Sequence, residues 1–283
     1  MQNILVILDK PKHEQIALQR ALELAEKTAI NLHLVSFVYE PVIGLPVLAG
    51  SLLDLSEQLQ KERANWLQEL GQEYSLPEQT TTEVVWHHDI PTWVGDYLTT
   101  KPCDLVLKTA QKQFGRGGFG SIDWRLIEQT SVPLWIAVNT HWIKRDRMVA
   151  ALDPALDNKL HVALNHRLLQ QGGALAQRLD AELELVACMP IPEMMVESAA
   201  FREQLDGLKD LLKNMIDESG ASSRQTHFVV GKPAAEINRL VDRTKARMIM
   251  VGRGVRRGPR GFVLGNTAER ILGRSNTDVL IVP

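Results

Sequence analysis

The chain has 283 residues, of which 45% are apolar, and its formal net charge at pH 7 is -2. This length suits two domains of ordinary size or one large one, and the apolar content can supply a substantial core. The nearly balanced charge excludes a global basic field, so no nucleic-acid partner is expected. No apolar run reaches the roughly 18 residues that a membrane-spanning helix needs, so no membrane association is expected.

The two cysteines indicate the compartment. Cys103 and Cys188 each lie in an apolar run and are expected to be buried thiols in a reducing compartment. Neither has a recognisable His–Asn or CxxC partner, which gives little support to nucleophilic catalysis. The opening residues MQNILVILDKPKH lack a basic leader, so no signal peptide is expected. Together these features predict a soluble, cytoplasmic protein.

Five apolar runs of strand length occur in the first half of the chain, and the second half repeats them in the same order. The first run of each half ends in aspartate, at Asp9 and at Asp153, with a proline shortly after. The paired runs are 4–9 with 148–153, 32–35 with 183–186, 84–87 with 228–231, 104–107 with 248–251, and 131–138 with 276–283.

Helical patterns fill the gaps between these runs. Apolar residues spaced for one helix face occur between the first two strands of each half, and longer helical patterns follow the second strand. Alternation of nearly continuous apolar strands with helices predicts parallel sheets covered on both faces. Polar residues between His141 and Asp146 separate an N-terminal domain, 1–141, from a C-terminal domain, 146–283.

Ligands of such sheets bind beyond the carboxyl ends of the strands, so the residues after the first and fourth strands are candidates. One of these segments is glycine-rich and basic: VGRGVRRGPRGFVLGNTAERIL, residues 251–272. A glycine loop between a strand and a helix presents backbone N–H groups to an anion. The loop matches neither a Walker A sequence nor the G-x-G-x-x-G dinucleotide pattern.

The loop resembles that of universal stress proteins, whose nucleotide-binding members carry G-x2-G-x9-G-[ST]. Gly252 fits the first position, Val255 stands where the second glycine belongs with Gly254 one place earlier, and Gly265 is followed by Asn266 and Thr267. The resemblance covers essentially the whole chain, including the Gly-x-Pro segment at Gly231 and the closing apolar strands. Two copies in one polypeptide indicate a tandem member, most similar to the E-type subgroup in Val85-Trp86-His87, Asp123-Trp124 and 265–269.

This resemblance implies two tandem Rossmann-like domains of the adenine nucleotide alpha hydrolase type. Each would be a five-stranded parallel sheet flanked by helices, and their final strands would pair in an intramolecular pseudo-dimer. It also implies a nucleotide site in the C-terminal half, with ATP or a related nucleotide, and Mg with it, as cofactor. The implied residues are Asp153, Gly252, Gly254, Gly265, Asn266 and Thr267.

The first half departs further from the pattern. Lys108 is aligned with the first glycine and Gln111 with the second, and Ser121 follows Gly120. A second, weaker site is therefore expected at Asp9, Gly120 and Ser121.

Each feature has a simpler interpretation. As an alternative to ligand binding, the loop at 252–267 is a structural turn, and its arginines (253, 256, 257 and 260) form a solvated basic cluster. In the same interpretation the two aspartates shape turns or cap helices. Asp123 is expected to open a helix, with a catalytic role as the alternative. His87, His88 and Asp89 suggest a metal, but adjacent strand residues point to opposite faces, so no metal site is expected.

Three functions remain open. The first is a non-enzymatic stress-response or regulatory protein that binds a small-molecule nucleotide or metabolite and an unknown protein partner. The second is a slow ATPase or nucleotide-transferring enzyme, which lacks a visible general base. The third is a carrier of an apolar or acyl-containing small molecule, suggested by the apolar stretch 42–50. A higher homo-oligomer is compatible with all three.

Overall fold

The computed structural model describes residues 1–39, 49–111, 119–138, 146–154, 159–190, 198–220, 223–254, 256–258, 261–263 and 266–283. The chain divides into two compact units, one of residues 1–109 with 130–132, the other of residues 110–129 with 133–283. Residues 110–138 therefore belong to the first repeat by sequence and largely to the second unit by their contacts. The division of the sequence at 141–146 stays a prediction about the two repeats.

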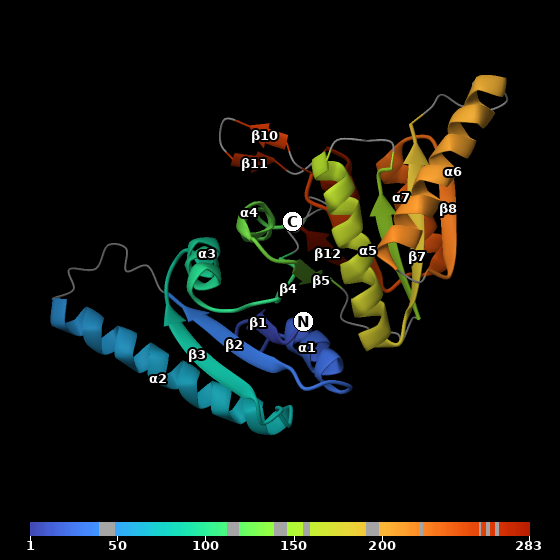
Figure 1. Ribbon diagram of the computed structural model, residues 1–283. Helices are drawn as coiled ribbons and strands as arrows, with labels where there is room; N and C mark the ends of the chain where they lie inside the picture. The colour runs from blue at the N-terminus through green and yellow to red at the C-terminus, as the bar shows by residue number, and fades with distance from the viewer. Residues whose placement is uncertain are drawn as a thin grey trace. The chain divides into compact units, whose positions relative to one another are not determined.

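The first unit is a parallel α/β sheet with strand order β3-β2-β1-β4. Its strands are β1 (Asn3–Ile7), β2 (Asn31–Val38), β3 (Thr80–Trp86) and β4 (Leu105–Thr109). Helices α1 (Ile16–Ala25), α2 (Ala49–Glu73) and α3 (Ile90–Thr100) connect them. Helix α1 packs on β1 and β4, and α2 packs on β2 and β3 (Figure 1).

The second unit repeats this order in β9-β6-β7-β8 and adds two strands, giving β5-β12-β9-β6-β7-β8. Its strands are β5 (Leu134–Ala137), β6 (Arg147–Leu152), β7 (Glu182–Met189), β8 (Gln225–Val230), β9 (Met248–Gly252) and β12 (Asp278–Val282). Its helices are α4 (Ser121–Gln129), α5 (Lys159–Leu179), α6 (Ala199–Ser219), α7 (Pro233–Thr244) and α8 (Asn266–Leu272). All five predicted strand pairs are present within the described residues.

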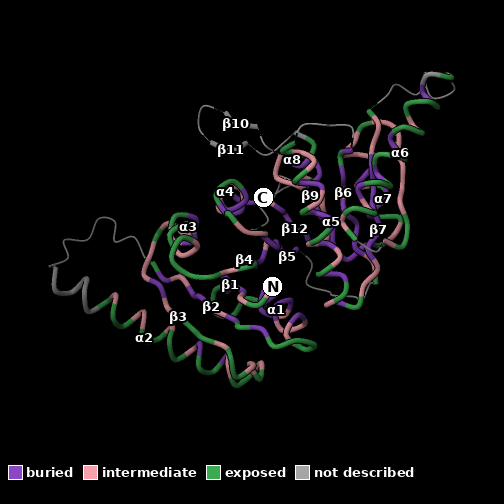
Figure 2. The backbone as a smooth tube through the Cα atoms, in the orientation of Figure 1, coloured by how far each residue is buried: buried purple, intermediate pink, exposed green. Residues whose placement is uncertain are grey.

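The core lies along the strands, as the apolar runs predicted. Strands β4, β5 and β12 are buried at every position, and β1 at every position but its first. Figure 2 shows this burial in purple on strands and on one side of several helices. A strand covered on both faces needs apolar side chains on both faces, so its sequence reads as a continuous apolar run. The predicted α/β class is therefore confirmed.

Strand β5 pairs antiparallel with β12, the final strand of the second repeat. Asp278, which is 1% exposed, fixes this pairing, because its carboxylate accepts hydrogen bonds from Trp135 Nε1 at 3.0 Å and from Val138 N at 2.8 Å. The expectation that the last strands of the two repeats pair with each other is thus met in the second unit.

The glycine loop contains an element that the sequence did not predict. Strands β10 (Arg256–Gly258) and β11 (Gly261–Val263) form a small antiparallel hairpin between β9 and α8. The apolar stretch 42–50 lies largely outside the described residues, so the predicted cleft there stays a prediction. No described helix combines the length and the apolar character needed to cross a membrane.

Candidate functional site

The turn that follows the first strand has the same construction in both repeats. Asp153 N donates to Asn165 Oδ1 at 3.2 Å, and Asn165 Nδ2 donates to Asp153 O at 2.9 Å. In the first repeat Asp9 N donates to Gln15 Oε1 at 3.1 Å, and Gln15 Nε2 donates back to Asp9 O at 3.4 Å. An amide side chain, from Gln15 just before α1 or from Asn165 within α5, thus holds each turn through the backbone of the aspartate.

The two aspartates differ in what surrounds their side chains. Asp153 is exposed at the carboxyl end of β6. Asp9 is half-buried, and its carboxylate accepts a short hydrogen bond from the hydroxyl of Thr109 at the end of β4. That hydroxyl oxygen also accepts from Ala17 N at 3.1 Å, which ties Asp9 into the packing of α1 on β4.

Strand register shows which residue of the first repeat corresponds to Gly252. Ile4 lies beside Leu105 in the first repeat, and Met148 lies beside Met248 in the second. Both Ile4 and Met148 stand five residues before the aspartate, so the repeats align with Thr109 at the position of Gly252. The alignment of Lys108 with Gly252 is therefore wrong by one residue, and Gln111 corresponds to Gly254 rather than Val255.

Gly252 ends β9, and helix α5 packs directly against it. A Cβ atom at this position would lie 2.5 Å from Leu164 Cδ2 and 2.7 Å from Leu164 Cγ, closer than carbon atoms can approach. Leu164 is 5% exposed and has little room to move. This close contact explains the glycine by packing, without any ligand.

The carboxyl ends of β6, β7 and β8 carry an acidic group of side chains around Cys188. Burial, followed by the nearby charges of Glu236 and Asp153, raises the pKa of the Cys188 thiol to about 11. The thiol donates to Gly231 O at 3.8 Å, where the backbone has φ +132°, a value that glycine accommodates best. Both cysteines are half-buried, so the expectation of buried thiols is met only in part.

The first arginine of the glycine loop has a structural role. Arg253 N donates to Val282 O at 2.7 Å, and its guanidinium donates to the carbonyl oxygens of Ile127 at 3.0 Å and Glu128 at 3.1 Å. These carbonyls lie at the end of α4, where no helical partner remains for them. Burial, and then the nearby Arg167, lowers the pKa of Arg253. Its guanidinium thus binds carbonyl oxygens of α4 and stays partly exposed.

Only some of the other candidate residues of the loop belong to the described part of the chain. Gly254 is half-buried just beyond β9, Asn266 begins α8, and Thr267 is exposed in the first turn of α8. Gly265, Val255 and Arg260 lie outside the described residues, as do the side chains at 256, 257 and 266.

In the first repeat the described ends of the glycine loop are joined by one carboxylate. Asp123 is fully buried in α4, and its Oδ2 accepts from Gln111 N at 2.8 Å and from Gly120 N at 3.2 Å. Asp123 opens the helix as predicted, with Ser121 exposed at the first helical position. A Cβ atom on Gly120 would lie 3.0 Å from Gln111 Cβ, so the two loop ends are in close contact.

The histidines after β3 do not lie as the sequence indicated. His87 and His88 follow the strand, and their rings stack with centroids 5.3 Å apart, so the expectation that they point to opposite faces is wrong. His87 Nδ1 accepts from Asp89 N at 3.0 Å, while Asp89 Oδ1 accepts from Thr92 N and caps α3. Both residues therefore organise the start of this helix.

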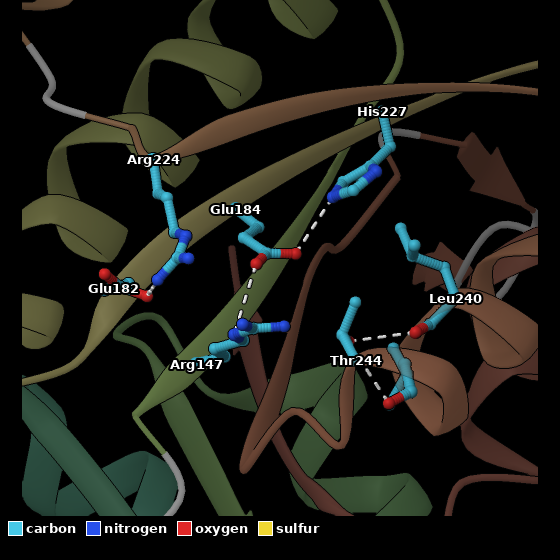
Figure 3. A network of polar contacts seen from close by, with 8 residues as sticks. Arg147, Glu182, Glu184, Arg224, His227, Leu240 and Thr244 are labelled. Carbon is cyan, nitrogen blue, oxygen red and sulfur yellow. Dashed lines mark hydrogen bonds and ion pairs between the residues drawn. The ribbon is translucent and has the colours of Figure 1, made fainter.

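A pair of ionisable residues that the sequence analysis did not single out occurs once in each repeat, with its two members exchanged. His33 on β2 lies 3.0 Å from Glu83 on β3, whereas Glu184 on β7 lies 2.9 Å from His227 on β8. The strand registers place His33 and Glu184 at equivalent positions, and Glu83 and His227 likewise. Figure 3 shows Glu184 between His227 and Arg147, whose Nε lies 3.6 Å from it. Alignment of the two repeats could have revealed this pair, because a histidine in one repeat stands opposite a glutamate in the other at both positions.

A cavity of about 920 Å³ lies elsewhere, at the amino ends of β1, β2 and β3 beside α3. Its lining includes His33, Glu83, Trp93 and Tyr97. In an α/β sheet the ligand edge is the carboxyl edge, where Asp9 and Asp153 lie. The cavity is therefore not part of the predicted site.

The fold and its internal duplication define a tandem α/β protein whose two repeats share one strand order. The universal stress protein family model matches residues 1–137 and again residues 155–283, so the chain belongs to this family, as a tandem member. Universal stress protein E of Photorhabdus laumondii is 26% identical over 99% of this chain and 94% of its own length. Universal stress protein E of Escherichia coli K12 is 24% identical over 99% and 93%. A crystal structure of a Pseudomonas aeruginosa PAO1 protein of unknown function has the same fold, with a TM-score of 0.74, 21% identity, and coverage of 99% and 92%.

Proposed function

We propose that the chain is a non-enzymatic stress-response or regulatory protein that binds ATP or a related phosphate-bearing nucleotide in its C-terminal repeat. The observation that supports this most is the state of Asp153, which is exposed at the carboxyl edge while Asn165 holds its turn. A carboxylate in this position can accept hydrogen bonds from two neighbouring ribose hydroxyls. Its counterpart Asp9 is engaged with Thr109 and is less suited to the role.

The phosphates of the nucleotide would lie toward the glycine loop. Gly254 lies two residues beyond the end of β9, and a glycine without a side chain lets an anion approach its backbone N–H group. Arg253 is not proposed as a phosphate ligand, because its guanidinium already donates to carbonyl oxygens of α4. The charge would come from the arginines of the hairpin segment, Arg256, Arg257 and Arg260.

The acidic residues at this edge make Mg²⁺ important. Asp153 and Glu236 both act electrostatically on Cys188, so two carboxylates lie near the place proposed for the ligand. Arg239 lies 2.6 Å from Glu236 and offsets its charge, so Asp153 is the carboxylate that would repel the phosphates of a free nucleotide. A divalent cation offsets this repulsion, and carboxylates supply the oxygen ligands that it prefers. We therefore expect tighter binding of the magnesium complex than of the free nucleotide.

Calorimetric titration of the full chain with ATP and AMP, with and without Mg²⁺, tests the proposal. Asp153→Asn removes the charge and keeps the shape, and the loss of a charged hydrogen bond is expected to weaken binding about tenfold or more. The matched variant Asp9→Asn is expected to leave the affinity unchanged. Equal weakening by both variants, or no heat with any nucleotide, would refute a site in the C-terminal repeat.

The other two functions are distinguished by the products. Release of inorganic phosphate by the wild-type chain, lost in Asp153→Asn, would indicate a slow ATPase or nucleotide-transferring enzyme. Mass spectrometry of the organic extract from purified protein would reveal an acyl-containing small molecule if the chain is a carrier.

A further inference from the structure

The buried carboxylate of Asp123 is a charge that the molecule carries inside one of its two glycine loops. It accepts from Gln111 N at 2.8 Å, twelve residues away, and from Gly120 N at 3.2 Å, and it is 0% exposed. The bond to Gly120, the residue before the helix, is the usual return bond of a capping box. The bond to Gln111 goes beyond helix capping, because it reaches back across the loop to the end of β4.

The second repeat has the same donors by position but lacks the carboxylate. Strand register aligns Gln111 with Gly254, and Gly120 and Gly265 each stand directly before the helix that follows the loop. The third residue of that helix is Asp123 in α4 and Ala268 in α8. The N–H groups that Asp123 occupies in the first repeat thus correspond to Gly254 and Gly265, two residues of the proposed nucleotide site.

We infer that Asp123 is an internal anion that fills the phosphate position of the first repeat and prevents any ligand phosphate from binding there. A helix start and a glycine loop bind one anion through converging N–H groups. A phosphate would have to displace a carboxylate that is fully buried, and a displaced buried charge without partners is strongly unfavourable. The chain therefore binds one nucleotide, in the C-terminal repeat; this stoichiometry rests on the proposed function, whereas the role of Asp123 does not.

Small carboxylate anions provide a direct test. Asp123→Ala removes the carboxylate and leaves space of its size beside the two N–H groups. Loss of two charge-assisted hydrogen bonds is expected to lower the midpoint of thermal unfolding by about 5–10 °C. Sodium formate is then expected to restore much of this loss in a concentration-dependent way, while sodium chloride at the same ionic strength does not.

Two reference proteins complete the experiment. The wild-type chain and Asp123→Asn keep a side chain in the position, so formate is expected to raise their unfolding midpoints no more than chloride does. If Asp123→Ala is insoluble, its refolding yield from urea in formate and in chloride gives the same comparison. A variant that formate and chloride affect equally would overturn the inference.

The stoichiometry is measured on the wild-type chain by calorimetry with ATP and Mg²⁺. One nucleotide per chain supports the inference, and two would overturn it while leaving the proposed function intact. No binding would refute the proposed function, and the formate experiment would still decide the role of Asp123.

Discussion

The contact between Gly252 and Leu164 leads to a prediction that separates packing from ligand binding. Replacing Gly252 with alanine places a methyl group 2.5 Å from Leu164 Cδ2 and 2.7 Å from its Cγ. Comfortable carbon contacts begin near 3.5 Å, so Leu164 must move by about 1 Å within a packed core. Overpacking of this kind costs about 1–3 kcal/mol. In a chain of this size that lowers the unfolding midpoint by about 3–10 °C, with no nucleotide present.

A double-mutant cycle shows whether Leu164 is the cause. Leu164→Ala alone is expected to cost about 2–5 kcal/mol, because it leaves a cavity. In that background Gly252→Ala is expected to cost little, since the new methyl group fills vacated space, which gives a coupling energy of about 1–3 kcal/mol. Gly173→Ala is the matched control, because nothing lies within 4 Å of a Cβ atom there. It should leave the midpoint unchanged or raise it slightly.

The measurement is thermal and urea unfolding of the full chain followed by circular dichroism. Wild-type stability of Gly252→Ala would refute the packing argument. The argument would also be refuted if the losses of stability from the two single variants added fully in the double variant, because additive effects mean that the two positions do not share the strain.

Three further predictions concern other contacts. Glu184→His is expected to lower the free energy of unfolding by about 3 kcal/mol, because it removes a buried carboxylate from its partners. Adding His227→Glu should recover much of this loss, because the first repeat carries the same pair in the reversed arrangement. Urea unfolding that shows no recovery in the double variant would contradict this. Arg253→Met should speed hydrogen exchange selectively in the last turn of α4, because the carbonyls there lose about 1.5–3 kcal/mol of charged hydrogen bonding. Exchange that is unchanged, or faster by the same factor throughout the chain, would argue against this role. With a thiol pKa of about 11, Cys188 should react with iodoacetamide at pH 8 on the order of 100-fold more slowly than a free thiol. The reaction rate, followed by mass spectrometry, should rise about tenfold per pH unit up to about pH 11. A plateau near pH 8.5 would show that the carboxylates and burial do not act on this thiol as described.

Much of the fold could be predicted because burial on both faces leaves a visible trace in the sequence. Strands such as β9 and β12 are apolar along nearly their whole length, and their repetition in two halves gave the tandem architecture. The hairpin β10–β11 could not be predicted, since three-residue strands rich in glycine and arginine have no characteristic period.

The site was harder to predict because glycine spacing alone does not determine register. The pattern of the loop aligns Lys108 with Gly252, whereas the pairing of β4 with β1 and of β9 with β6 places Thr109 at that position. The contact of Leu164 with Gly252 joins segments far apart in the chain, and no local pattern encodes it. The sequence predicted that Asp123 opens a helix, but not its hydrogen bond to Gln111 on the other side of the loop.

The pairing of β5 with β12 means that the gene cannot be divided between the repeats without consequence. A cut within residues 139–145 would separate β5 from the polypeptide that contains its partner and leave β12 as an unpaired apolar edge strand on the C-terminal fragment. Two separately produced halves would have to find each other at a rate set by their abundance, whereas one translation product always supplies both strands in equal amounts. Because both repeats lie in one chain, the pairing of β5 with β12 does not depend on how much protein a cell makes.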